Sequence, residues 1–267
     1  EIGACDWSSD VCSSDLFVIS AAANTFQVST TQGGSAVDLT DAGSGTQEVR
    51  LVIDVPVVID PNVQVFSTST AVPALTVGNW PDGINLTLTI RTGAYIVGAG
   101  GAGGDGSLIT ALNDGGDGGT AFFTRYPITV DNEGTIGGGG GGGGAGFFSD
   151  TVDPQNRFVY SGAGGGGAGR IPGAAGARVG TTGATLAEPG TLTTGGAGSD
   201  PNFPPPISYS GGGGDGGDLG QAGSDGATSA NPVDPPEGSG GAAGTAIDGD
   251  SFVTLSGSGS VLGPQVN

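Results

Sequence analysis

The segment 126–146 reads YPITVDNEGTIGGGGGGGGAG, and it joins the two kinds of sequence from which the chain is built. Apolar and polar residues alternate over 126–130, which is typical of a β-strand. A turn with Gly134 follows, and eight consecutive glycines then occupy 137–144. Glycine disfavours both helix and strand interiors, so these eight residues predict neither. The same change from alternating strand to glycine tract recurs elsewhere in the chain.

Three segments share this organisation and predict stacked β rungs. Each has an alternating apolar run, a turn with a glycine (Gly93, Gly134 or Gly259), one to three apolar residues and a further glycine. Their unequal spacing differs from the fixed period of a regular solenoid. The three segments are 86–98, 126–137 and 251–263.

Residues 17–97 predict a small all-β module with almost no α-helix. FVISAAANTFQVSTT (17–31), the pair Gly33-Gly34 and AVDLT (36–40) predict a β-hairpin. The near-continuous Val and Ile of EVRLVIDVPVVID (48–60) predict a strand buried on both faces and interrupted at Pro56. Two further apolar runs, 63–77 and 84–97, complete the module.

The region 98–250 is dominated by glycine, since only eight of the 59 glycines precede Gly98. A flexible linker is one interpretation, because such tracts have few side chains to bury. The other is a packed bundle of polyglycine II helices, which rise about 3.1 Å per residue and bond only to their neighbours. Bulky aromatic residues between the tracts favour the bundle. The last rung, 251–267, closes the chain.

The first sixteen residues, EIGACDWSSDVCSSDL, have no apolar periodicity. They resemble the translated read-through of a sequencing adapter, which is not expected to belong to the fold. On this interpretation the natural N-terminus lies outside this sequence. The alternative is a short disulfide loop between Cys5 and Cys12, the two cysteines of the chain.

Composition excludes several classes of function. The net charge of −20, from 26 acidic and 6 basic residues, argues against nucleic acid and anionic membranes as partners. The chain has no His, Lys or Met, which removes Ser-His-Asp nucleophiles, His-ligated metals and Schiff-base chemistry. No apolar run reaches the roughly 18 residues of a membrane span. We expect no enzymatic activity, cofactor or metal.

Three motifs invite a functional interpretation but fit poorly. Residues 98–103 satisfy G-x-G-x-x-G, yet more glycines follow in place of the helix that a dinucleotide site needs. Residues 213–218 begin like a calcium-binding nonapeptide, but Gly220 occupies the large apolar position. Two acidic pairs, Asp114 with Asp117 and Asp150 with Asp153, have the paired carboxylates that glycoside cleavage uses. Acidic residues beside glycine are more often solvated turn formers.

Two long stretches, ALTVGNWPDGINLTLTIRTGAYIVGAGGAGG and GGTAFFTRYPITVDNEGTIGGGGGGGGAG, resemble the glycine-rich region of tailed-bacteriophage tail proteins. The segment ANTFQVSTTQGGSAVDLTDAGSGT is similar to a small β module of phage structural proteins. In function the chain resembles the tail-tip adhesins of T-even-like phages, in which loops between polyglycine II helices contact the bacterial receptor. This chain differs from those adhesins in its N-terminal β module.

The resemblance implies a virion tail protein whose partners are a bacterial surface receptor, protein or glycan, and other phage tail proteins. Aromatic loop residues with neighbouring arginines are the expected receptor contacts. Inward-facing packing residues are the alternative at each position. A purely structural glycine-rich component and a surface-polysaccharide depolymerase are the alternative functions. The expected contacts are Phe122, Phe123, Arg125, Phe147, Phe148, Arg157, Phe158, Tyr160, Phe203 and Tyr209.

Overall fold

The computed structural model divides the chain into two compact units, Glu1–Leu51 and Val52–Asn267. The division differs from the one expected at Gly98, because strands before and after that glycine share the same sheets. The segment 1–16, with Cys5 and Cys12, and the run 36–40 lie outside the described residues. The structure describes residues 17–22, 25–29, 53–106, 113–153, 156–178, 185–199, 211–227 and 237–267.

The first unit contains an antiparallel hairpin of β1 (Phe17–Ala22) and β2 (Thr25–Ser29). Phe17 lies opposite Ser29, and Ala22 lies opposite Thr25. The run 17–29 thus forms a hairpin by itself, and the expected turn at Gly33-Gly34 lies outside the described residues.

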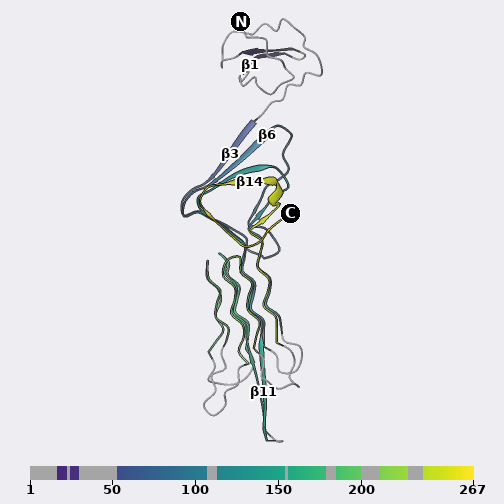
Figure 1. Cartoon of the computed structure of the whole chain (residues 1–267), viewed down its shortest axis with the longest axis vertical. Helices are drawn as coiled ribbons and strands as arrows, with labels where there is room; N and C mark the ends of the chain where they lie inside the picture. Colours follow the sequence, from purple (N-terminus) through teal and green to yellow (C-terminus); the bar gives the residue numbers. More distant parts are fainter. Residues whose placement is uncertain are drawn as a thin grey trace. The chain divides into compact units, whose positions relative to one another are not determined.

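The second unit contains three four-stranded parallel sheets (Figure 1). The chain visits the sheets in a fixed order, and each passage through all three forms one coil of a parallel β-helix. The first sheet consists of β3 (Ile53–Ile59), β6 (Ile84–Ile90), β9 (Ile128–Asn132) and β14 (Val253–Ser256). The second sheet consists of β4 (Gln64–Phe66), β7 (Tyr95–Val97), β10 (Thr135–Gly137) and β15 (Ser260–Leu262). The third sheet consists of β5 (Leu75–Thr76), β8 (Phe122–Phe123), β13 (Ile247–Asp248) and β16 (Gln265–Val266). A 3-10 turn, η1 (Asp250–Phe252), precedes β14.

Equivalent positions of the four coils lie in register and stack along the coil axis. Val57 pairs with Leu88, Leu88 with Val130, and Val130 with Leu255. The pairing confirms that the segments 86–98, 126–137 and 251–263 are equivalent, stacked rungs. Their inward-facing side chains form one core, whose members include Leu88, Ile90, Ile96, Phe122, Val130, Ile136 and Ile247, all 2% exposed or less.

A further coil, β3-β4-β5, precedes the three that the sequence predicts. Asn62 has the positive φ of 66° at its turn, where Gly93 has 80° in the next coil, so the glycine signal is missing. The prediction for β3 was wrong in two respects. The strand runs through Pro56 without interruption, because an edge strand needs no N–H on its free side. It is also largely exposed, with Val57 at 49% and Val58 at 47%.

The glycine tracts leave the β-helix at one corner, between the second and third sheets. The chain departs after β7 and returns at β8, and it departs again after β10 and returns at β13. The described parts of these two insertions are extended segments that lie side by side (Figure 1). Backbone hydrogen bonds join them, so the described tracts are packed chain and not linker.

The longest glycine run lies at the centre of this bundle. Its N–H groups donate in three directions and its C=O groups accept from three others, and all residues of 137–145 are buried. Successive bonds to one neighbour are three residues apart: Gly98, Gly101 and Gly104 donate to residues 137, 140 and 143 at 3.0, 2.9 and 2.8 Å. The surrounding segments are 98–104, 113–119, 165–168, 214–220, 221–224 and 238–244.

The central position explains why this run contains only glycine. At every residue from 138 to 144 an added Cβ would overlap a carbonyl oxygen of a neighbouring segment. The three-residue period of the hydrogen bonds equals the period of an extended threefold helix. The polyglycine II conformation itself stays a prediction.

We expect Gly141→Ala to destabilise the protein by about 3 kcal/mol, because its Cβ would meet the carbonyl oxygen of Gly241 and force two backbones apart. Gly78→Ala is the matched control, since an added Cβ there meets nothing within 4 Å. Its effect is expected to stay within about 0.5 kcal/mol. Differential scanning calorimetry measures both, and equal melting temperatures would contradict a close-packed bundle.

Candidate functional site

The glycine bundle has two different ends. Near the β-helix the segments are joined by short described turns, 169–173, 191–194 and 218–221. At the other end, which we call the distal end, the described segments stop or continue into a hairpin. At this end, residues of different segments that lie side by side are joined by backbone hydrogen bonds, and we call such neighbouring residues one level of the bundle. The N–H groups of Gly106, Ala145 and Phe147 donate to the carbonyl oxygens of Ala177, Asn113 and Ala227.

The breaks in the described bundle all have their flanking residues at the distal end. The segments 107–112, 179–184, 200–210 and 228–236 each connect two residues of that level, and they lie outside the described residues. They include Phe203 and Tyr209, two of the expected contacts. The fold therefore brings the starts and ends of connections from distant parts of the sequence to one end of the bundle.

A long hairpin of β11 (Gly146–Asp153) and β12 (Asn156–Gly162) also begins at the distal end. β11 continues the central glycine segment and extends beyond the glycine segments around it (Figure 1). The antiparallel register places Phe148 opposite Tyr160, Asp150 opposite Phe158 and Thr151 opposite Arg157. Four of the expected contacts, Phe148, Arg157, Phe158 and Tyr160, therefore belong to one hairpin.

Two other expected contacts are buried. Phe122 is 0% exposed in the core of the β-helix. Phe147 is 3% exposed and packs with Ala145 at the base of the hairpin. The alternative assignment, an inward-facing packing residue, fits both positions.

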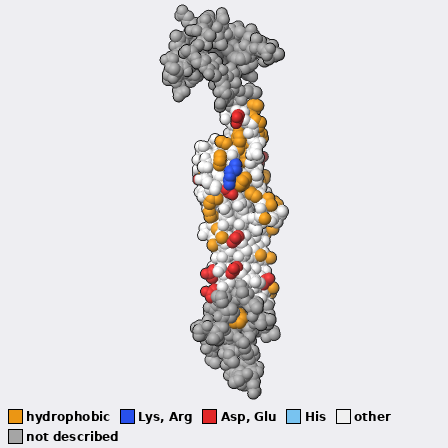
Figure 2. All heavy atoms as spheres, turned by 90° about the vertical axis from the view of Figure 1, so that its right-hand side faces the viewer, with side chains coloured by type: hydrophobic (Ala, Val, Ile, Leu, Met, Phe, Trp, Pro, Cys, Tyr) orange, Lys and Arg blue, Asp and Glu red, His pale blue; other side chains and the backbone are white. Residues whose placement is uncertain are grey.

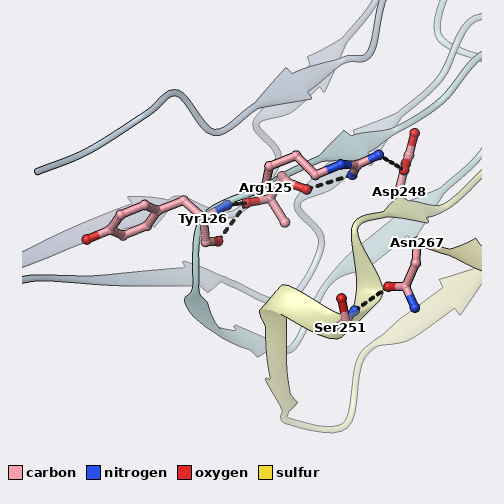
Figure 3. Close-up of polar contacts among 6 residues, drawn as sticks. Arg125, Tyr126, Asp248, Ser251 and Asn267 are labelled. Atoms are coloured by element: carbon pink, nitrogen blue, oxygen red, sulfur yellow. Dashed lines mark hydrogen bonds and ion pairs between the residues drawn. The ribbon is translucent and has the colours of Figure 1, made fainter. Parts of the chain in front are cut away.

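Arg125 and Phe123 lie at a corner of the β-helix and not at the distal end. The Arg125 guanidinium donates to Asp248 Oδ1 and to the Thr124 carbonyl oxygen, both at 2.8 Å (Figure 3). It also lies over the Phe123 ring, 4.4 Å from the centroid. The neighbouring Tyr126 hydroxyl donates to backbone carbonyl oxygens that include Ile84 at 2.8 Å. These contacts join the second and third coils, which is a structural role.

The acidic motifs have structural explanations as well. In the segment that resembles a calcium-binding nonapeptide, Asp215 accepts a hydrogen bond from Gly198 N–H and Asp218 accepts one from Gly195 N–H. The described residues contain no group of three or more acidic, His or Cys side chains placed to hold a metal ion. Residues 98–103 form an extended segment with no helix after them in 104–106. Among the described residues no helix is long and apolar enough to cross a bilayer.

Arg125→Ala is expected to lower the free energy of unfolding by about 1 kcal/mol, because an ion pair and a cation–π contact are both lost at a partly exposed site. Arg91→Ala is the control: its nitrogen lies 3.5 Å from Asp60, and both side chains are more than half exposed. Calorimetry measures the stability and a phage adsorption assay measures the function. Lost adsorption at unchanged stability would instead make Arg125 a receptor contact.

Comparison with known proteins places the chain in one family. The family model described as phage tail fibre adhesin Gp38 matches residues 17–266. No curated protein matches the chain. Among solved structures, the chain is similar to the crystal structure of the gp37-gp38 adhesin tip complex of the bacteriophage S16 long tail fiber, with 25% sequence identity and a TM-score of 0.43 over 76% of this chain. It spans 66% of that chain, just under two thirds. The protein is a component of the virion tail, and it belongs to the Gp38 family of phage tail fibre adhesins.

Proposed function

We propose that this tail adhesin binds a receptor on the bacterial surface with the distal end of its glycine bundle. The observation that carries the proposal is the convergence of the β11–β12 hairpin and the flanks of four further connections at that end. A receptor patch needs several chain segments held close together on a rigid base. The bundle supplies such a base, because hydrogen bonds fix the position of each segment against its neighbours.

The hairpin is the proposed principal contact. An extended two-stranded hairpin has two free strand edges and can present side chains beyond the bundle. Aromatic residues bury large areas with few rotatable bonds, which favours them at interfaces. The proposed contacts are Phe148, Phe158, Tyr160 and Arg157 of the hairpin, with Phe203 and Tyr209 of the segment 200–210.

The β-helix is the proposed point of attachment to another tail protein. Its first coil has no neighbour on one side among the described residues of its unit, and apolar side chains are exposed there. Val57 lies in register with the core residue Leu88, yet it is 49% exposed, and Ile53 is 45% exposed. The last coil is open in the same way, since Leu255, which lies in register with Val130, is 42% exposed. A core with open ends favours coverage by a protein partner.

Two alternatives lead to different outcomes. A purely structural tail component would support adsorption whatever the sequence of the hairpin. A depolymerase would degrade the surface polymer of the host on incubation with purified protein. The adhesin family favours a tail protein with a binding role over an enzyme.

We expect a phage that carries Phe148→Ser with Tyr160→Ser to adsorb at least about tenfold more slowly, because two opposed aromatic positions of the hairpin lose their anchors. The melting temperature of the purified protein should stay unchanged, since both positions lie beyond the buried Phe147. Adsorption kinetics on host cells and calorimetry measure the two quantities.

The matched control is Trp80→Ser, which removes a 41% exposed aromatic side chain between β5 and β6, at a distance from the distal end. We expect normal adsorption of this variant. A stronger test replaces 148–160 with a Gly-Ser segment and keeps the buried Phe147 and Ser161. Normal adsorption of that phage with a correctly folded protein would refute the hairpin as a receptor contact.

A further inference from the structure

Six exposed aspartates on the glycine segments share one arrangement. In each, the carboxylate Oδ1 accepts a hydrogen bond from a backbone N–H of the neighbouring segment. Figure 2 shows carboxylates at separate levels along the visible face of the bundle. The pairs are Asp105 with Ala177 (2.6 Å), Asp114 with Ser239 (2.8 Å), Asp117 with Ala242 (2.8 Å), Asp215 with Gly198 (2.8 Å), Asp218 with Gly195 (3.0 Å) and Asp225 with Gly240 (2.8 Å).

Where the two segments run parallel, one residue of the neighbouring segment makes two hydrogen bonds. Its N–H donates to the aspartate, and its carbonyl oxygen accepts from the residue after the aspartate. Gly115, which follows Asp114, donates its N–H to the carbonyl oxygen of Ser239 at 2.8 Å. The N–H of the same Ser239 then donates to the Asp114 carboxylate. Asp117 with Ala242, and Asp105 with Ala177, repeat this pattern.

Where the segments run antiparallel, the donor is displaced by two residues. Gly216, which follows Asp215, donates to the carbonyl oxygen of Gly196 at 2.9 Å, and Gly198 donates to Asp215. Asp218 and Asp225 follow the same rule. The six pairs therefore obey two geometrical rules, one for each relative direction of the chains.

The position of these aspartates follows from the packing of the bundle. The central segment bonds neighbours on all sides, whereas outer segments have N–H groups, such as those of Ser239, Gly240 and Ala242, that donate to no backbone carbonyl and bond only an aspartate. At residues 138–144 inside the bundle a Cβ would overlap a neighbouring backbone, whereas the six aspartates stand at exposed positions of the outer segments. Aspartate is short and accepts hydrogen bonds through a charged oxygen, so it can bond an adjacent outward amide.

We propose that these aspartates close the outer amide rows of the bundle against pairing with a second copy of the chain. The bundle is held together by rows of N–H groups that bond rows of C=O groups, and an open amide row would accept a glycine segment of another molecule in the same way. Exposed sheet edges carry the same risk, and proteins commonly block them with charged residues. The carboxylate occupies the amide that a second copy would use. The six aspartates, five of them followed by glycine and Asp218 by Leu219, are thus hydrogen-bond caps of the bundle surface.

The test compares Asp114→Ala/Asp117→Ala with Asp114→Asn/Asp117→Asn in the full chain. In the alanine variant we expect the Ser239 and Ala242 amides to exchange with deuterium about tenfold faster at a dilution where the protein is monomeric. On concentration, sedimentation velocity should then show dimers and larger species. The asparagine variant should keep both slow exchange and the monomer, because its amide oxygen also accepts the N–H bond.

The charge control is Asp82→Ala/Asp250→Ala, whose carboxylates accept no hydrogen bond from the residues that the structure describes. This variant loses the same charge and should remain monomeric. Association of the control or of the asparagine variant to the same extent would assign the effect to charge and overturn the proposal. Unchanged exchange at Ser239 and Ala242 in the alanine variant would overturn it too. If the double alanine variant fails to fold, Asp225→Ala with exchange read at Gly240 provides the same test.

Discussion

The hydrogen bonds between buried backbone N–H and C=O groups are the interaction on which the rest of this structure depends. Ordering a glycine costs about 1–2 kcal/mol of backbone entropy, and a backbone hydrogen bond contributes only about 0.5–1.5 kcal/mol net. A lone glycine segment is therefore unstable, and it has no side chains to bury in compensation. The central run 137–144 is ordered because its hydrogen bonds are distributed over six neighbours and are shielded from water. Removing any neighbour would leave buried amides without partners, so the segments are stable only together.

The β-helix and the bundle are stabilised in different ways, the first by an apolar core and the second by backbone hydrogen bonds. The coils have a conventional apolar core, in which Leu88, Phe122 and Ile136 are buried. They also hold the points where the glycine segments start, since β7 and β10 are adjacent strands of one sheet and continue directly into adjacent segments of the bundle. The spacing of the strands thus sets the spacing of the first glycine segments. Aspartates then complete the outer surface, where glycine alone would leave amides exposed.

The sequence predicts much of this architecture, and its errors have physical causes. The rungs were recognisable because a glycine follows each alternating run, and the first coil was missed because Asn62 takes the turn position that Gly93 takes in the next coil. Burial of β3 was overestimated because apolar composition does not reveal which strand lies at an edge. The candidate site was harder to predict: aromatic content cannot separate Phe122, which fills a core, from Phe148, which lies on a hairpin. Which connections share an end depends on the number and direction of the glycine segments, and no local pattern encodes it.

The insertion of the bundle into the β-helix has a consequence for the order of folding. Strands β3 and β6 are close in sequence and can pair early, but the last coil must find partners far along the chain. The Ser256 hydroxyl donates to the Val130 carbonyl oxygen, for example, across 126 residues. Closing such a loop is slow while the intervening chain is disordered, and it becomes easier once compact glycine segments bring the two sides of the corner together. The strands of the C-terminal coil are therefore expected to pair last, and their pairing indicates that the bundle has formed.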